Sequence, residues 1–175
     1  MDIYILENEY LRIEASDFGA ELQSIRSKTT DFEYLWHGDK AYWARRSPIL
    51  FPIVGKVWDG RMKYCGEEYP LSQHGFARDC EFTKLGEKQM SELLPKADEG
   101  AQKCGFVLYS NEETKKRYPF DFALYIIYCL IDNCLEVNWI VENRTDGVLY
   151  FQIGAHPAFN YRDFDENADI QGYMK

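Results

Sequence analysis

Two of the three histidines in this 175-residue chain stand in segments that interrupt regular secondary structure. His74 precedes Gly75, and His156 lies between Gly154 and Pro157. A strand that ends at a glycine or proline turn can deliver a polar side chain to a sheet edge or a cleft. Histidine is the side chain best matched to proton transfer near neutral pH. We therefore interpret both histidines as candidate acid–base residues, with a structural imidazole in a turn as the alternative for each.

A pair of arginines offers a second kind of chemistry. Arg45 and Arg46 precede an extended apolar run that contains Pro48 and Pro52. A guanidinium group suits the vicinal hydroxyls of a sugar, or a phosphate. A salt bridge with one of the 29 acidic residues is the structural alternative. The third histidine, His37, is interpreted as a loop residue.

Other reaction classes leave no signature in the chain. There is no GxSxG turn for a serine nucleophile, no HExxH metal motif and no glycine-rich phosphate loop. The five cysteines are odd in number and none forms a CxxC pair, so we expect neither a disulfide framework nor a zinc site. The sequence predicts no cofactor and no metal, and it favours acid–base chemistry on a neutral polar ligand.

Composition and charge limit the classes of binding partner that we expect. The formal net charge of −9 disfavours nucleic acid and anionic membrane surfaces, and the basic run at 115–117 is interpreted as a solvated loop. Aromatic residues make up 16% of the chain, which suits strands and also suits clefts that pack against sugar rings. The first residues lack the pattern of a signal peptide, and no apolar window reaches membrane-spanning length. A cytoplasmic location is the default expectation.

The elements that must position these residues are mostly strands. Alternating or β-branched patterns predict strands at 3–6, 10–13, 19–25 and 33–36, and a meander of three strands at 122–130, 135–143 and 148–153. The turns of that meander are marked by Asp132 with Asn133 and by Asp146 with Gly147. We predict one large sheet with part of a second, an all-β sandwich.

Helix signals are few. The spacing of Ser110 and Glu113 predicts a capping box with Ser110 as N-cap, and a short helix fits residues 87–94. Residues 95–103 are polar and predict a loop. The chain shows no internal repeat and no linker, so we expect one domain over residues 1–175.

Three segments together resemble the aldose 1-epimerase, or galactose mutarotase, family, and in particular its LacX-like members. The segments are RRSPILFPIVG at 45–55, QHGFARD at 73–79 and GAHPAFN at 154–160, with weaker matches at 19–25 and 118–122. The resemblance implies a large antiparallel β-sandwich (the galactose mutarotase-like supersandwich) with a sugar cleft across one sheet. Because members of the family are much longer than this chain, it also implies that residues 1–175 form an incomplete sandwich domain without its C-terminal part.

The resemblance implies a role for each candidate. His156 would donate a proton to the ring oxygen of an aldohexose, His74 would contact and polarise the sugar, and Arg45, with Arg46 beside it, would bind sugar hydroxyls. A glutamate near the C-terminal end of family members acts as the base, and no carboxylate here, including Glu142, matches its position; the same is true of Asp163 and Glu166. The expected activity is interconversion of α and β anomers without a cofactor, impaired in this chain.

Three alternatives remain at this point. The chain could be a carbohydrate-binding module without catalysis, since it keeps the sugar-contacting motifs and lacks the base. It could act on a hexose phosphate, with the arginines meeting the phosphate. A purely structural β-domain is the third alternative. A homo-oligomer is compatible with each of them.

Overall fold

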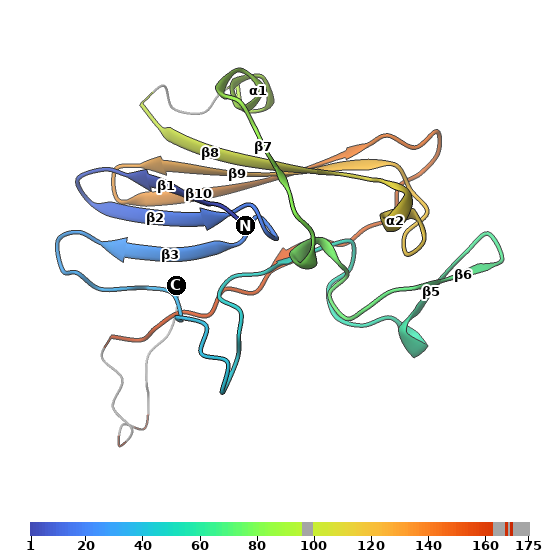
Figure 1. Ribbon diagram of the computed structural model, residues 1–175, viewed down its shortest axis with the longest axis horizontal. Helices are drawn as coiled ribbons and strands as arrows, with labels where there is room; N and C mark the ends of the chain where they lie inside the picture. Colours follow the sequence, from blue (N-terminus) through green and yellow to red (C-terminus); the bar gives the residue numbers. More distant parts are fainter. Residues whose placement is uncertain (96–99, 163–166, 168, 170–175) are drawn as a thin grey trace.

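The computed structural model describes residues 1–95, 100–162, 167 and 169, and within them two antiparallel sheets face each other (Figure 1). The smaller sheet has the order β1-β2-β3 and the larger sheet the order β10-β9-β8-β7. Two further two-stranded sheets, the long-range pair β11-β4 and the hairpin β5-β6, complete the pairing. The strands are β1 (Ile3–Glu7), β2 (Leu11–Ser16), β3 (Leu22–Ser27), β4 (Ile49–Leu50), β5 (Arg61–Tyr64), β6 (Glu67–Pro70), β7 (Thr83–Lys84), β8 (Gln102–Tyr109), β9 (Phe122–Ile131), β10 (Cys134–Asn143) and β11 (Gly154–Ala155). The predicted all-β fold of antiparallel sheets is confirmed.

The hairpin of β9 and β10 follows the prediction closely. The two strands pair from Phe122 opposite Asn143 to Ile131 opposite Cys134, and the turn is made by Asp132 and Asn133. Asp132 adopts a positive φ of 47°, a conformation that aspartate and asparagine tolerate better than most residues. Alternation along β10 and the β-branched and aromatic content of β9 were therefore sufficient to locate both strands.

Several predicted elements differ in the structure. The prediction of a third meander strand is wrong, because residues 148–153 form no ladder and only the two-residue β11 follows them. Residues 33–36 contribute two isolated bridges, at Glu33 and Leu35, instead of a strand. In the segment 19–25, Gly19 and Ala20 occupy a turn with φ of 72° and 46°, and the strand starts at Leu22. The β5-β6 hairpin was not predicted.

The helices are short, as expected. Helix α1 (Glu87–Leu93) matches the predicted segment, and β8 begins at Gln102 inside the stretch predicted as a loop. Helix α2 (Glu112–Lys115) is capped by Asn111, one residue after the predicted Ser110. The Asn111 side chain accepts hydrogen bonds from the backbone N–H groups of Glu113 and Thr114, both at 3.0 Å, so it satisfies the first free amides of the helix. Single 3₁₀ turns occur at Trp58–Gly60 and Ala77–Asp79.

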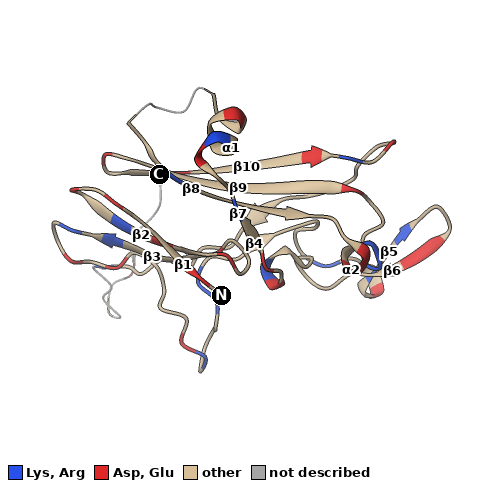
Figure 2. Ribbon diagram, turned by 45° about the horizontal axis from the view of Figure 1, so that its top comes forward, with Lys and Arg blue, Asp and Glu red and all other residues tan. Residues whose placement is uncertain are grey.

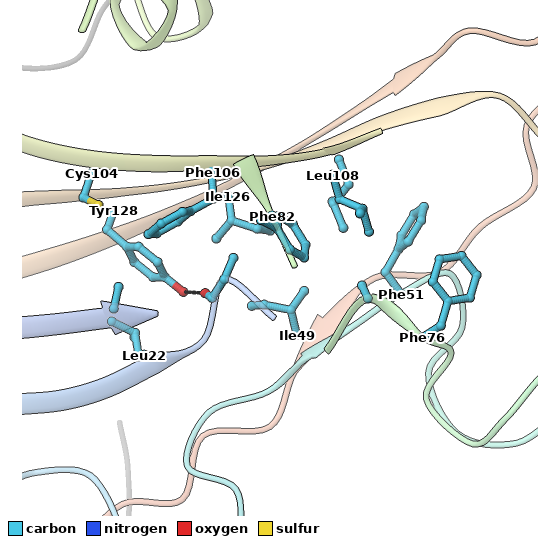
Figure 3. Packing of buried hydrophobic residues seen from close by; sticks show 14 of the residues in the cluster. Leu22, Ile49, Phe51, Phe76, Phe82, Cys104, Phe106, Leu108, Ile126 and Tyr128 are labelled. Atoms are coloured by element: carbon cyan, nitrogen blue, oxygen red, sulfur yellow. Dashed lines mark hydrogen bonds between the residues drawn. The ribbon is translucent and has the colours of Figure 1, made fainter. Parts of the chain in front are cut away.

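The main core fills the space between the two sheets (Figure 3). Tyr4 of β1 packs its ring against Phe106 of β8 at a centroid distance of 5.4 Å. The hydroxyl of Tyr128 on β9, which is 1% exposed, donates a 2.6 Å hydrogen bond to the carbonyl of Ala20. Burial without that partner would leave the hydroxyl unsatisfied, so the bond joins the two layers at one point.

The other face of the larger sheet is covered by α1. Met90 of the helix is buried there in a second apolar cluster with Ile127 and Cys129 of β9 and Val107 of β8. Because side chains alternate along a strand, β9 serves the main core with one set of residues and this cluster with the other. That double burial explains why β9 is apolar along almost its whole length.

Candidate functional site

The segment that runs from Arg46 to Gly55, which we call the central segment, lies between the two histidine motifs in space and is hydrogen-bonded to both. On one side β4 pairs with β11, with Leu50 opposite Gly154 and Ile49 opposite Ala155. The pairing continues past the strands, because the N–H of His156 donates to the carbonyl of Pro48 at 3.1 Å. This ladder fixes the backbone of His156 relative to the central segment.

The other side of the central segment carries the His74 motif. Phe51 forms a parallel bridge with Gly75, and the N–H of Phe76 donates to the carbonyl of Phe51 at 2.9 Å. Gly75 has a φ of +73°, and a Cβ built on it would lie 2.1 Å from the Phe51 carbonyl oxygen. Only glycine fits that close approach. The three sequence motifs therefore meet, with the central segment between the other two.

His74 is held by two hydrogen bonds to one residue. Its backbone N–H donates to the carbonyl of Gly55 at 2.7 Å, and its Nδ1 accepts from the N–H of Gly55 at 3.0 Å. An imidazole nitrogen that accepts an N–H carries no proton, so the neutral ring has its proton on Nε2. The side-chain amide of Gln73 lies 3.3 Å from Nε2 and can present its oxygen to that N–H by turning over. The ring of His74 is thus fixed in place, with Nε2 as the nitrogen that can donate a hydrogen bond.

The charge state of His74 follows from its surroundings. Burial lowers its pKa from the ordinary value, and the positive charges of Arg78 and His156 lower it further. All three effects favour the neutral ring, in agreement with the bond that Nδ1 accepts.

His156 has a different environment. Its side chain is exposed, and its ring meets the ring of Trp43 edge to face at a centroid distance of 5.1 Å. The backbone N–H is bound to Pro48, as described, while the imidazole is oriented by an aromatic contact. A ring that remains accessible can exchange a proton with a ligand.

Both candidate arginines are bound to groups of the protein. Arg45 forms an ion pair with Asp79 and donates through Nη1 to the carbonyl of Arg78 at 3.0 Å. Arg46 donates through Nη1 to the carbonyl of Gln23. The Arg45 side chain is 27% exposed, so part of it faces solvent. Their predicted role as sugar ligands stays a prediction, and the contacts of Arg45 connect its motif to the motif of His74.

Two further residues belong to this region and were not singled out from the sequence. Glu21 is 6% exposed and accepts the backbone N–H groups of Arg46 at 2.8 Å and Ser47 at 2.9 Å, which anchors the start of the central segment. Arg78 donates through Nη2 to the carbonyl of Gln73 at 2.8 Å, while its buried Nε has no hydrogen-bond partner among the described residues and lies 3.8 Å from Oδ2 of Asp79. Arg78 could have been noticed because it stands four residues after His74 in the same motif.

Other groups do not join the site. Glu142 accepts from Tyr125 at 2.9 Å and from Arg144 at 3.1 Å, in a cluster on β9 and β10. Asp163 and Glu166 lie outside the described residues. Among the residues that the structure describes, no three His, Cys, Asp or Glu side chains are grouped as metal ligands. In the same part of the chain, no helix is both long and apolar enough to cross a membrane.

The antiparallel β-sandwich with its two paired histidine motifs defines a structural class, and comparison with known proteins identifies the family. Residues 2–174 match the family model described as Aldose 1-epimerase, so the chain belongs to that family. The plasmid-encoded protein LacX of Lactococcus lactis is 34% identical over 161 residues, which are 89% of this chain and 50% of LacX.

Solved structures agree. A galactose mutarotase related enzyme from Lactobacillus acidophilus superposes with a TM-score of 0.83 at 37% identity, covering 96% of this chain and 52% of that protein. A galactose mutarotase-like protein from Lactobacillus casei gives a TM-score of 0.79 at 36% identity, covering 91% of this chain and 50% of that protein. The chain spans about half the length of the relatives it matches. The predicted family and its mutarotase-like β-sandwich are therefore confirmed.

Proposed function

We propose that this chain provides the acid half of an aldose 1-epimerase site and binds an aldohexose between His74 and His156. The observation that carries the proposal is the placement of the two histidines on either side of the central segment, one fixed as an Nε2–H donor and the other accessible. Such a pair offers a hydrogen bond to orient an oxygen and a separate group to move a proton.

The proposed reaction is anomer interconversion. His156 in its protonated form donates its proton to the ring oxygen, while a carboxylate base takes the proton of the anomeric hydroxyl. The bond between the anomeric carbon and the ring oxygen breaks, which leaves an aldehyde and a hydroxyl. The aldehyde group rotates, the ring hydroxyl attacks its other face, and both protons return. His74 donates from Nε2 to a sugar oxygen throughout, and Arg45 and Arg46 contribute to the sugar-binding region.

The base is the part of the site that this chain does not supply in our proposal. Two carboxylates that contact the motifs are already engaged, since Glu21 accepts two backbone amides and Asp79 pairs with Arg45. Sugar binding without catalysis is therefore the second candidate for the chain by itself, and a hexose phosphate is a variant of the ligand. Residues 1–175 as one partial domain, a cytoplasmic location and a homo-oligomer stay predictions.

A titration followed by NMR tests the binding site. Imidazole signals of His74 and His156 are followed while glucose or galactose is added, and His37, whose ring lies tilted against Trp36 at a centroid distance of 4.3 Å, serves as the internal comparison. We expect shifts at His74 and His156 and none at His37. Equal or absent shifts at all three histidines would contradict the proposed site.

Polarimetry tests the chemistry. Freshly dissolved α-glucose or α-galactose is followed with and without the protein, and with the His156→Ala variant. Any acceleration over buffer should vanish in that variant. If sugar shifts the histidine signals and raises the melting temperature while rotation proceeds at the rate of buffer, the chain binds without catalysing.

A further inference from the structure

One stretch of the inner face of the larger sheet is open. Val137 and Trp139 on β10 lie directly opposite Tyr128 and Ile126 on β9. Residues opposite each other in an antiparallel pair point to the same face of the sheet. Tyr128 is 1% exposed and Ile126 is not exposed, whereas Val137 is 39% and Trp139 is 38% exposed. The core is therefore closed over β9 and open over the adjacent strand.

The reason lies in the smaller sheet, which covers only part of the larger one. Contacts between the layers fall on β8 and β9, through Tyr4 with Phe106 and through Tyr128 with Ala20. Figure 2 shows β10 along the edge of its sheet, with β1, β2 and β3 at a distance from it. Side chains of β10 that point inward extend beyond this cover.

The backbone of β10 is open as well. This ten-residue strand pairs with β9 along one edge, and within the described residues its other edge pairs with no strand. A long apolar edge strand presents unpaired N–H and C=O groups and readily accepts another strand. Natural proteins usually protect such an edge by keeping the strand short, by placing charged side chains on it, or by covering it with another element. Here Val137 and Trp139 are the exposed members of the inward set, between Leu135 and Val141, which pack against the core.

We infer that the open edge of β10, with Val137 and Trp139, receives strands of the polypeptide that corresponds to the other half of the longer relatives. The inference rests on the family membership and not on the proposed chemistry. The Lactobacillus acidophilus protein superposes with a TM-score of 0.83 yet this chain covers 52% of it, so that protein contains nearly as much polypeptide again. A second copy of this chain is a poorer occupant, because each copy carries a net charge of −9.

The test supplies that half from LacX, whose matched half resembles this chain. The part of LacX outside the match is co-expressed with the 175-residue chain, and association is measured by size-exclusion chromatography with light scattering. Val137→Lys and Trp139→Lys place a charge on the inner face, and Glu136→Lys is the matched control because Glu136 is exposed on the opposite face of β10. We expect the control to bind as the unmodified chain does, and the two inner-face variants to bind at least about 10-fold more weakly.

A fused protein gives a second readout that does not depend on separate folding of the LacX half. In it, the LacX half follows residue 175, and hydrogen exchange of the β10 amides that do not face β9 is compared with exchange in the chain alone. Slower exchange in the fusion is expected. Equal exchange, equal binding by all three lysine variants, no association, or a homodimer of the chain that protects β10 would each overturn the inference. None of these readouts involves sugar, so they stand apart from the test of the site.

Discussion

The two histidine motifs hold the same central segment in opposite ways. At His74 the side chain is fixed, because Gly55 binds both its backbone and its Nδ1, and Gly75 brings the chain against Phe51. At His156 the backbone is fixed by a ladder to the central segment, and the ring is left exposed beside Trp43. One motif therefore defines the direction of a hydrogen bond, and the other defines the position of a group whose proton can move.

The difference shows how one extended segment can serve two tasks. A donor that must orient a ligand benefits from a locked ring and a neutral charge state. A proton donor needs access to the ligand, and access to solvent so that it can be reprotonated after it has given up its proton. The predictions below probe this contrast in order of the expected size of the effect.

The largest effect should come from Gly75, with Gly154 of the other motif as its comparison. Gly75→Ala places a Cβ 2.1 Å from a backbone oxygen at a positive φ, whereas Gly154→Ala places one 3.1 Å from a Val54 methyl group. We expect the first variant to lose about 3 kcal/mol or more of unfolding free energy, and the second to change by less than about 1 kcal/mol. Urea denaturation measures both. Similar losses in the two variants would show that the motifs are equally constrained.

A smaller effect should follow from removing each imidazole. His74→Ala leaves the N–H of Gly55 without its acceptor, so we expect a loss of about 1–2 kcal/mol in unfolding free energy. His156→Ala removes an exposed ring and should stay within about 0.5 kcal/mol. The measurement is again urea denaturation. If the order of the two variants were reversed, the ring of His156 would be the structural one.

The smallest effect should be a pH dependence that belongs to His74. Burial, Arg78 and His156 lower its pKa in the folded protein below the value of 6.5 that an unfolded histidine has. Between those two pKa values the unfolded chain binds more protons, so stability rises with pH. The contribution is complete above pH 6.5 and is lost as the pH falls through the folded pKa.

Two measurements check this dependence. An NMR titration should place the midpoint of His74 below 6.5. In the His74→Ala variant the decline of stability below that pH should become shallower than in the unmodified chain. A midpoint above 6.5 would contradict the neutral, Nε2-protonated state that the bond from Gly55 indicates.

The fold was predictable where local pattern and long-range pairing agree. The β9-β10 hairpin has both a turn signal and partners of equal length, so its strands were located well. Residues 148–153 are mostly apolar and aromatic, but such a run indicates at most an extended conformation and cannot show whether a neighbouring strand exists. In the structure this segment donates from Gln152 to the carbonyl of Pro52 at 2.9 Å without forming a ladder. The N-cap was missed by one residue because serine and asparagine are nearly equal as caps.

The residues of the site could be predicted from the sequence motifs, but the contacts between the motifs could not. The resemblance brought His74, His156 and the arginine pair together, and the structure places their segments side by side. Nothing in the sequence indicates that the N–H of Gly55 reaches Nδ1 of His74, because that bond depends on the turn between them. Glu21 gave no signal either, since an acid within an alternating strand pattern suggests a solvent-facing position, yet it is buried under the central segment.

The anchoring of the central segment has a consequence for the time course of folding. Glu21 reaches it from 25 residues away, and the side chain of Asn160 ties the region after His156 to the carbonyl of Glu33 across 127 residues. Contacts between distant parts of a chain form only after long loops have closed, which makes them slow. The hairpin of β9 and β10, whose partners are neighbours along the chain, can form early. We therefore expect the two histidines to come together among the last events of folding.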